Sequence, residues 1–408
     1  MGCGPCNSWL KTYGARDQLA ILAIEDGGTV FAGYELSGTW VARLAQDGSI
    51  LWQRDYANPD GNGAVPVSVV NSDGGYKVIT TWSITHSGAL VFDVNAADGT
   101  VRAQRFYTAA NGIRLSSATP TAEGGLLFVG RAFPTSGASV AYVAHVSADA
   151  SVDWSDTFSQ PDASVFVRGC AEQDGGYFCN GDTPTPFGRE LVLLQLDGQG
   201  ALKSSSTVGN GTPWLLGGPV THQGNGDFVI AATADSYNDE IGGYTAPGEP
   251  CAVTIDSKGT TRAAMLSATG VSQFVVPTDG GVLIGAETND VDGGTAAFFS
   301  VMNGKIAQSW QGPFWGALSP QSATVRADEV LVAGQYETAS LRGAYLLKMS
   351  TPGAILVPGP AVGGAPDLSM QTPLTLVTDA GFVTTVTEVN SLSMSGANGG
   401  VITVLSGK

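Results

Sequence analysis

Residues 122–131 read AEGGLLFVGR, a tight acidic turn followed by an apolar strand, and variants of this stretch recur along the whole chain. The copies are spaced by about 50 residues, which is the repeat length typical of β-propeller blades. Eight copies can be aligned, anchored at Gly28, Gly75, Gly125, Gly176, Gly226, Gly281, Glu329 and Gly381. The repeat therefore predicts an all-β fold, an eight-bladed β-propeller.

Each repeat also contains a second tight turn, between a third and a fourth predicted strand. Asp98-Gly99, Asp197-Gly198 and Asn303-Gly304 are clear examples. Asp-Gly and Asn-Gly supply the positive backbone angles that two-residue hairpins require. Many strands are apolar on both faces, as in VLVAG at 330–334, which suits a strand stacked between two neighbouring blades. We therefore expect each blade to consist of four antiparallel strands.

The eighth repeat has only three predicted strands, and the missing one is expected from the N-terminus. Residues 8–13 (SWLKTY) align with LWQRDY in the first repeat, which places Tyr13 under Tyr56. Pairing the two ends of the chain in one sheet leaves no blade with an incomplete edge. We predict that residues 8–408 form a single propeller closed by an N-terminal outer strand, with residues 1–7 as a tether.

The charge balance excludes several kinds of partner. Asp and Glu outnumber Lys and Arg by 36 to 19, a net charge of -17, so nucleic acid or an anionic membrane surface is not an expected partner. No apolar run reaches the length of about 18 residues that a membrane-spanning helix needs. Many acids fall in the tight turns, where a carboxylate bonds nearby backbone N–H groups. One face of the ring is therefore expected to be acidic whatever the function.

The N-terminal cysteines, Cys3 and Cys6, lie in CGPC, the tetrapeptide of thioredoxin-like enzymes. Such a site needs a preceding strand and a following helix, and neither is predicted here. We interpret Cys3 as the lipid-anchored first residue of a mature bacterial lipoprotein, preceded by an added Met1 and Gly2. The alternative is a frayed end whose cysteines pair with each other or have no role. The interpretation predicts an exported protein that is periplasmic, anchored to the outer membrane or at the cell surface.

A second pair of cysteines flanks a predicted hairpin turn, in CAEQDGGYFC. If Asp174-Gly175 is a two-residue loop, Cys170 lies opposite Cys179 in a non-hydrogen-bonded pair, where the Cα spacing of about 4.5 Å falls at the short end of the disulfide range. We predict a disulfide, which favours an oxidising compartment. Cys251 is expected to be a buried apolar residue.

The pattern of a DGG turn, an apolar strand and then D-G-x-x-x-W resembles bacterial propellers of the quinoprotein-like and outer-membrane-assembly-lipoprotein type. Gly48 to Trp52 has this Gly-x-x-x-Trp spacing, and Ala150 to Trp154 keeps the tryptophan without the glycine. The resemblance implies the propeller architecture and carries no activity. Quinone-dependent dehydrogenases of this shape typically have two adjacent cysteines, and this sequence has none, so we expect no quinone cofactor.

Local signatures of catalysis are scarce. His86, His145 and His222 belong to different repeats and have no zinc-like spacing, so each is expected to be a surface or structural histidine. The sequence has no phosphate-binding loop, dinucleotide fingerprint or nucleophile elbow. A hydrolase or lyase that uses two carboxylates from separate loops would leave no such signature.

The connections between blades carry aromatic residues, at Phe166, Trp214, Phe274, Phe314 and Trp315. Aromatic side chains concentrate contact energy at interfaces, so Trp214, Phe314 and Trp315 are candidates for partner binding at the mouth of the central channel. The alternative is that they wedge between blades.

One loop, ADSYNDEIGGYTAPGEP at 234–250, is longer than most of its counterparts. Tyr237 and Tyr244 are further candidates for partner contact, and a passive surface loop is the alternative. Flexible clusters of oxygen ligands suit calcium, the one metal that we consider as a cofactor. Its candidate ligands are Asp235, Asn238, Asp239 and Glu240.

The function that the sequence favours is a non-catalytic binding or scaffolding propeller of the bacterial cell envelope or exterior, with a protein or glycan partner. The alternative is a carbohydrate-active enzyme or a glycan-binding protein that uses the mouth of the central channel.

Overall fold

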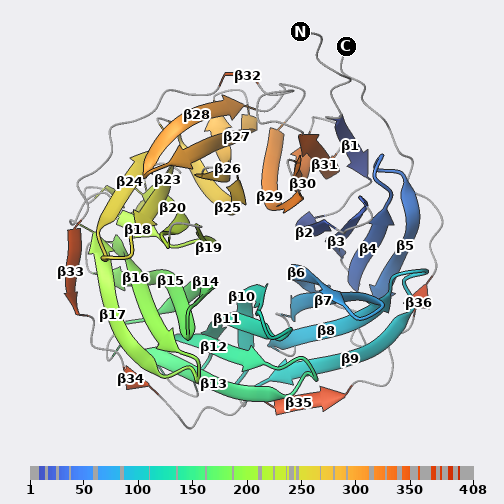
Figure 1. Ribbon diagram of the computed structural model, residues 1–408, viewed down its shortest axis with the longest axis horizontal. Helices are drawn as coiled ribbons and strands as arrows, with labels where there is room; N and C mark the ends of the chain where they lie inside the picture. The colour runs from blue at the N-terminus through green and yellow to red at the C-terminus, as the bar shows by residue number, and fades with distance from the viewer. Residues whose placement is uncertain are drawn as a thin grey trace.

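The chain forms a ring of seven antiparallel sheets, so the computed structural model is an all-β, seven-bladed β-propeller of mostly four-stranded blades (Figure 1). The expectation of eight blades was wrong. The structure describes residues 9–349, apart from 14–16, 24–26, 36–37, 58–62, 83–86, 110, 135–136, 161–162, 186–187, 210–213, 224–225, 236, 239–242, 245–247, 267, 279–280, 291–292, 312–316, 327–328 and 338–341, together with 357–358, 369–373, 377–378, 385–388 and 394–395.

Blades 1 to 4 have four strands each, in chain order from the centre of the ring outward (Figure 1). Blade 1 contains β2 (Asp17–Ala23), β3 (Thr29–Glu35), β4 (Gly38–Leu44) and β5 (Ile50–Ala57). Blade 2 contains β6 (Val65–Ser72), β7 (Gly75–Trp82), β8 (Gly88–Asn95) and β9 (Val101–Thr108). Blade 3 contains β10 (Ile113–Pro120), β11 (Leu126–Ala132), β12 (Val140–Val146) and β13 (Val152–Ser159). Blade 4 contains β14 (Phe166–Gln173), β15 (Gly176–Thr185), β16 (Gly188–Asp197) and β17 (Leu202–Gly209).

Blades 5 to 7 follow the same order with small departures. In blade 5 the first strand is split into β18 (Trp214–Leu216) and β19 (Val220–His222), followed by β20 (Phe228–Asp235), β23 (Glu249–Ile255) and β24 (Thr261–Met265). A small hairpin, β21 (Tyr237–Asn238) and β22 (Gly243–Tyr244), lies in its long loop. Blade 6 contains β25 (Gly270–Thr278), β26 (Gly281–Asp290), β27 (Gly293–Met302) and β28 (Lys305–Gln311). Blade 7 contains β29 (Ala317–Arg326), β30 (Glu329–Glu337), β31 (Arg342–Met349) and the N-terminal β1 (Trp9–Tyr13).

The N-terminal strand closes the ring in blade 7, where β1 pairs antiparallel with β31. The hydroxyl of Tyr13 donates to the carbonyl of Gly48 in blade 1 at 2.9 Å. Tyr56 makes the same bond from blade 1 to the carbonyl of Gly99 in blade 2, at 2.6 Å. The alignment of Tyr13 with Tyr56 therefore reflects a shared role, the docking of one blade's outer strand onto the next blade's turn.

The eighth repeat does not form a blade, because blade 7 already has its fourth strand and β2 of blade 1 lies against β29 and β30 of blade 7. The described strands beyond blade 7 pair instead with outer strands around the ring (Figure 1). These are β32 (Val357–Pro358) on β28, β33 (Ser369–Pro373) on β17, β34 (Val377–Thr378) on β13, β35 (Thr385–Glu388) on β9 and β36 (Met394–Ser395) on β5. The third strand that the eighth repeat predicts, in GGVITVLSGK at 399–408, lies outside the described residues.

The two faces of the ring differ in composition. The acidic face carries the turns between first and second and between third and fourth strands, and the connection face carries the links between blades and between second and third strands. In five turns of the acidic face an aspartate side chain accepts a backbone N–H two residues on, at Asp47, Asp98, Asp149, Asp197 and Asp256. Hydrogen bonds from Ser147 and Ser151 lower the pKa of Asp149 to about 2. These acids therefore stabilise turns, as the sequence indicated.

The predicted disulfide joins Cys170 on β14 to Cys179 on β15, with the two Cα atoms 4.0 Å apart. The register of the hairpin is the predicted one, with the two cysteines directly opposite each other. Cys251 is a free, buried thiol. A disulfide is consistent with an extracytoplasmic protein. In the part of the chain that the structure describes, no helix is long and apolar enough to cross a membrane.

Candidate anion-binding site

Half of the residues that we predicted for partner binding, metal binding and the lipid anchor lie outside the described part of the chain. Cys3, Asp239, Glu240, Phe314 and Trp315 are outside it altogether. For the remaining candidates the structure gives the backbone alone: Trp214 begins β18, Asp235 ends β20, and Tyr237 and Asn238 pair with Tyr244 and Gly243 in the β21–β22 hairpin.

The two described aromatic residues of the blade connections have different surroundings. Phe274 is buried and its ring fills the space beside Gly285, so it wedges within the protein. Phe166, the first residue of β14, is half-buried at the connection face. Three guanidinium groups surround its ring. Their carbons lie 5.7 Å (Arg131), 5.8 Å (Arg168) and 5.7 Å (Arg189) from the ring centroid.

A fully buried carboxylate holds two of these arginines in place. Asp182 accepts hydrogen bonds from Nε of Arg168 at 2.7 Å and from Nη1 of Arg189 at 2.6 Å. The side chain of Asp182 is 0% exposed, whereas those of Arg168 and Arg189 are 40% and 30% exposed. Since charge-assisted bonds of this kind fix a planar guanidinium in orientation, both arginines are positioned before any ligand arrives.

The third arginine comes from the neighbouring blade and faces further positive charge. Arg131 ends β11 and lies directly opposite Arg114 of β10 in the strand register. Like charges directly opposite each other in a sheet are destabilising. Partial burial, with the charges of Arg114 and Arg168, lowers the pKa of the Arg131 guanidinium. Arg131 also lies 5.2 Å from the ring centroid of Phe133.

We refer to Arg114, Arg131, Arg168 and Arg189, with Phe133, Phe166 and Asp182, as the arginine cluster. It gathers four of the chain's 19 basic residues at one point of a protein whose net charge is -17. Asp182 forms ion pairs with two of the four, Arg168 and Arg189. The cluster therefore carries a local positive charge at the connection face of the blade 3–4 boundary, next to aromatic rings.

Arg131 occupies a position that recurs in the second strand of every blade from 2 to 7. In each blade this residue lies near the connection-face end of the second strand, opposite the first strand of the same blade, and we call it the rim position. Its occupants are Thr81, Arg131, Asp182, Thr233, Glu287 and Gln335. In blades 2 and 5 the threonine hydroxyl accepts the N–H of Leu115 and of Ser272, each in the first strand of the next blade. In these two blades the rim position therefore docks one blade onto the next.

Sequence reasoning named Phe166 but missed the arginines, because they are scattered over a long stretch of the chain and follow no known motif. One signal was available. In the aligned repeats the rim position reads threonine in TTW and AAT, whereas it reads arginine in FVGR and glutamate in IGAE. An arginine where two other blades carry a docking threonine is a sign of a different role.

Neither of the two described histidines, His145 and His222, contributes to this site. His145 lies in blade 3 near the acidic face, with Nδ1 2.8 Å from Asp153 and Nε2 3.5 Å from the hydroxyl of Thr121. That hydroxyl also accepts the N–H of Gly125, and the His145 ring stacks on Trp154. His145 is buried and held on both ring nitrogens, as expected of a structural histidine. His222 is exposed, and His86 lies outside the described residues.

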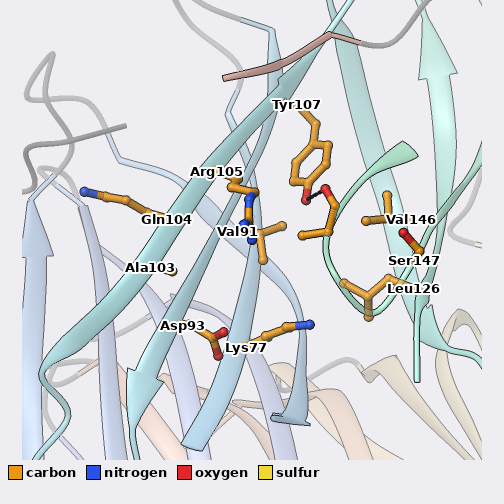
Figure 2. A pocket seen from close by; sticks show the side chains of 11 residues that line it. Lys77, Val91, Asp93, Ala103, Gln104, Arg105, Tyr107, Leu126, Val146 and Ser147 are labelled. Carbon is orange, nitrogen blue, oxygen red and sulfur yellow. Dashed lines mark hydrogen bonds between the residues drawn. The ribbon is translucent and has the colours of Figure 1, made fainter. Parts of the chain in front are cut away.

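A small pocket lies at the boundary of blades 2 and 3, apart from the arginine cluster (Figure 2). It lies on the acidic side, between Lys77, Asp93 and Arg105 of blade 2 and the turn of blade 3. At this boundary the hydroxyl of Tyr107 donates to the carbonyl of Ala150 at 3.0 Å. Its interior of about 10 Å³ has room for one water molecule, which is too little for a sugar ring.

Known proteins resemble this chain in fold alone. No family model and no curated protein matches the sequence. An ulvan lyase of polysaccharide lyase family PL25 superposes with a TM-score of 0.56 at 12% identity, covering 84% of this chain and 96% of the lyase. An ulvan lyase of the same family bound to -[GlcA(1-4)Rha3S]- gives 0.54, with the same identity and coverage. A quinohemoprotein alcohol dehydrogenase from Comamonas testosteroni gives 0.44 at 11% identity, covering 88% and 78%. The neighbours thus include quinoproteins, the group that the repeat pattern resembled.

Proposed function

We propose that this protein binds an anionic glycan at the arginine cluster, as a glycan-binding or carbohydrate-active propeller. The observation that carries the proposal is the convergence of three guanidinium groups on Phe166, with two of them fixed by the buried Asp182. The proposal assigns binding and leaves any catalytic step unassigned.

The chemistry of the cluster suits a carboxylate or a sulfate carried on a sugar ring. A guanidinium presents its N–H groups in a flat fork that matches two oxygens of such a group. The half-buried ring of Phe166 offers an apolar surface beside that fork, against which the C–H groups of a sugar ring can pack. Because Arg114 and Arg131 lie opposite each other, a bound anion also relieves a repulsion that the free protein contains.

The structural neighbours add support from fold-level analogy. Two lyases with TM-scores above 0.5 are named for ulvan, and one of them was solved with a saccharide that contains a glucuronate and a sulfated rhamnose. At 12% identity none of their residues can be transferred to this chain. The analogy therefore suggests the kind of ligand, and the arginine cluster supplies the residues.

If the anionic groups belong to a protein partner, the arginine cluster serves the binding or scaffolding function that the sequence favoured. We propose an extracytoplasmic location, which the disulfide supports. Attachment to a bacterial outer membrane through Cys3 is the finer proposal. Metabolic labelling of the native protein with a fatty acid, and its loss in Cys3→Ala, tests that attachment.

Calcium binding by Asp235, Asn238, Asp239 and Glu240 remains a separate proposal for the long loop of blade 5. Calorimetric titration with calcium should give a heat of binding that the Asp235→Ala, Asp239→Ala double variant lacks. No heat at millimolar calcium would eliminate this metal site.

The glycan proposal is tested by measuring the affinity of the whole protein for hyaluronan, chondroitin sulfate and ulvan, with neutral dextran as the control. We expect binding to at least one anionic polymer, none to dextran, and a loss of affinity of about tenfold or more in Arg131→Gln, since hydrogen bonds to charged groups contribute about 1.5–3 kcal/mol. An acidic peptide of aspartate and glutamate residues distinguishes a protein partner. Equal affinity of Arg131→Gln and the native protein for every polymer would contradict the proposal.

A further inference from the structure

A second charged residue occupies the rim position, on the other side of the ring. Glu287 lies on β26 of blade 6 and faces blade 7, as Arg131 of blade 3 faces blade 4. In Figure 1, β26 and β11 lie on opposite sides of the centre of the ring. The connection face therefore has positive charge on one side and a carboxylate on the other.

Glu287 makes its contact to the next blade in an unusual way. Its Oε2 accepts the hydroxyl of Ser319 on β29 at 2.6 Å. In the strand register Pro320 stands where Leu115 and Ser272 stand in blades 3 and 6, and proline has no N–H to donate. Threonine could not dock blade 6 onto blade 7 as it docks blade 2 onto blade 3 and blade 5 onto blade 6.

Docking alone does not require a charge at this position. An asparagine or glutamine would accept the Ser319 hydroxyl equally well without a partly buried carboxylate, whose desolvation is unfavourable. Glu287 is half-buried and thus keeps access to solvent. A carboxylate oxygen accepts up to two hydrogen bonds, so one bond from Ser319 leaves acceptor capacity for hydroxyl groups of a ligand.

A second polar group near Glu287 is incompletely satisfied. The hydroxyl of Tyr345 on β31 is fully buried and has no hydrogen-bond partner among the described residues. Burial, and then the charge of Glu287, raises the pKa of this phenol. Buried polar groups without a partner are rare and call for an explanation such as a water or a ligand atom that completes the bond.

We propose that Glu287 and Ser319 form a second subsite of the glycan site, which takes the hydroxyl groups of an uncharged sugar unit and rejects an anionic one. This inference rests on the proposed function, because the ligand is the same chain that the arginine cluster holds. The preferred ligand is then a glycan that carries anionic and uncharged units together. Selection against chains with a charge on every unit comes from repulsion by Glu287, and attraction to the arginines provides the affinity.

The test measures the affinity of native protein, Glu287→Gln and Arg131→Gln for two sets of oligosaccharides of increasing length. One set comes from hyaluronan, in which charged and uncharged units alternate. The other set comes from ulvan. For Glu287→Gln we expect an affinity about tenfold lower for the longer hyaluronan fragments and higher for the ulvan fragments. The shortest fragments, which reach the arginine cluster alone, should not respond. Arg131→Gln should lose affinity for both sets.

Two results separate the failure of this inference from the failure of the proposed function. If Glu287→Gln changes both sets in the same direction, or neither, while Arg131→Gln weakens both, the second subsite is overturned and the glycan site stands. If native protein binds neither set, the second subsite is overturned, and the glycan site is overturned with it when chondroitin sulfate is not bound either. Thr233→Val, which alters the rim position of blade 5, is the control for stability: it should lower the unfolding midpoint and leave both affinities unchanged.

Discussion

The boundary between blades 2 and 3 and the boundary between blades 3 and 4 are built from the same positions and differ in what those positions do. At the first, Thr81 accepts the N–H of Leu115, and Tyr107 donates to the carbonyl of Ala150. At the second, the rim position holds Arg131, which faces Phe166. At the first boundary these side chains bond to the next blade, whereas at the second boundary three guanidinium groups gather around the ring of Phe166, and Asp182 pairs with two of them. The comparison identifies the boundary at which we propose that an anionic ligand binds.

The largest effect is expected from removing the strand that closes the ring. A chain that begins at Gly14 lacks β1, exposes the edge of β31 and loses the burial of Tyr13, which is 3% exposed. Loss of a buried aromatic side chain and of strand pairing should lower the free energy of unfolding by about 3–5 kcal/mol or more. Urea denaturation measures this, and an unchanged midpoint would show that β1 does not pair with β31.

The closing of the ring could be predicted from the sequence in part. The match of SWLKTY to LWQRDY correctly indicated that an N-terminal strand completes the last blade and that Tyr13 acts like Tyr56. It could not indicate which blade is last, because TDAGFVTTVT fits the repeat as well as its predecessors do. The number of blades follows from how the sheets pack around the ring, which no single repeat encodes.

The next effect in size concerns the carboxylate beneath the arginines. Asp182→Ala leaves Arg168 and Arg189 without their shared buried partner, and breaking a buried ion pair from one side costs about 3–5 kcal/mol. Anion affinity should fall as well, because the two guanidinium groups lose their fixed orientation. Asp182→Asn keeps the shape and should show a smaller loss of stability. If Asp182→Ala retained both stability and affinity, the cluster would not be preorganised.

A pair of substitutions at the rim position separates the two boundaries most clearly. Thr81→Val removes the acceptor for the N–H of Leu115 and should lower stability by about 1–3 kcal/mol with no change in anion affinity. Arg131→Gln removes one member of a repelling pair, so stability should stay the same or rise by up to about 1 kcal/mol while affinity falls. Thermal unfolding and calorimetry on the same samples measure both quantities. Equal destabilisation by the two substitutions would remove the distinction.

The arginine cluster could be predicted only in part. Phe166 stood out as an aromatic residue in a blade connection, but nothing local links it to Arg131 or Arg189, which the ring brings together from two blades. The role of the buried Asp182 could not be predicted either, because the NGD sequence that contains it resembles the acidic turns of the other repeats. The information was present in the columns of the aligned repeats, where a docking threonine is replaced by a charge.

The smallest effect is a loss of stability at high pH. Burial is the main cause that raises the pKa of Tyr107 from 10.0 to about 12, so the folded state favours the neutral phenol that donates to Ala150. This contribution is complete below pH 10 and is lost as the pH rises toward 12, because the unfolded chain ionises first. Tyr107→Phe should reduce the decline in unfolding midpoint over that range. An identical decline in both proteins would assign it to other groups.

The most direct measurement is a crystal structure of the native protein with a hyaluronan or ulvan oligosaccharide bound. The predicted result is a carboxylate or sulfate within hydrogen-bond distance of Arg131 and Arg168, with a sugar ring against Phe166 on the connection face of a seven-bladed ring. An oligosaccharide seated on the acidic face, or anywhere else while the arginine cluster stays empty, would contradict the account.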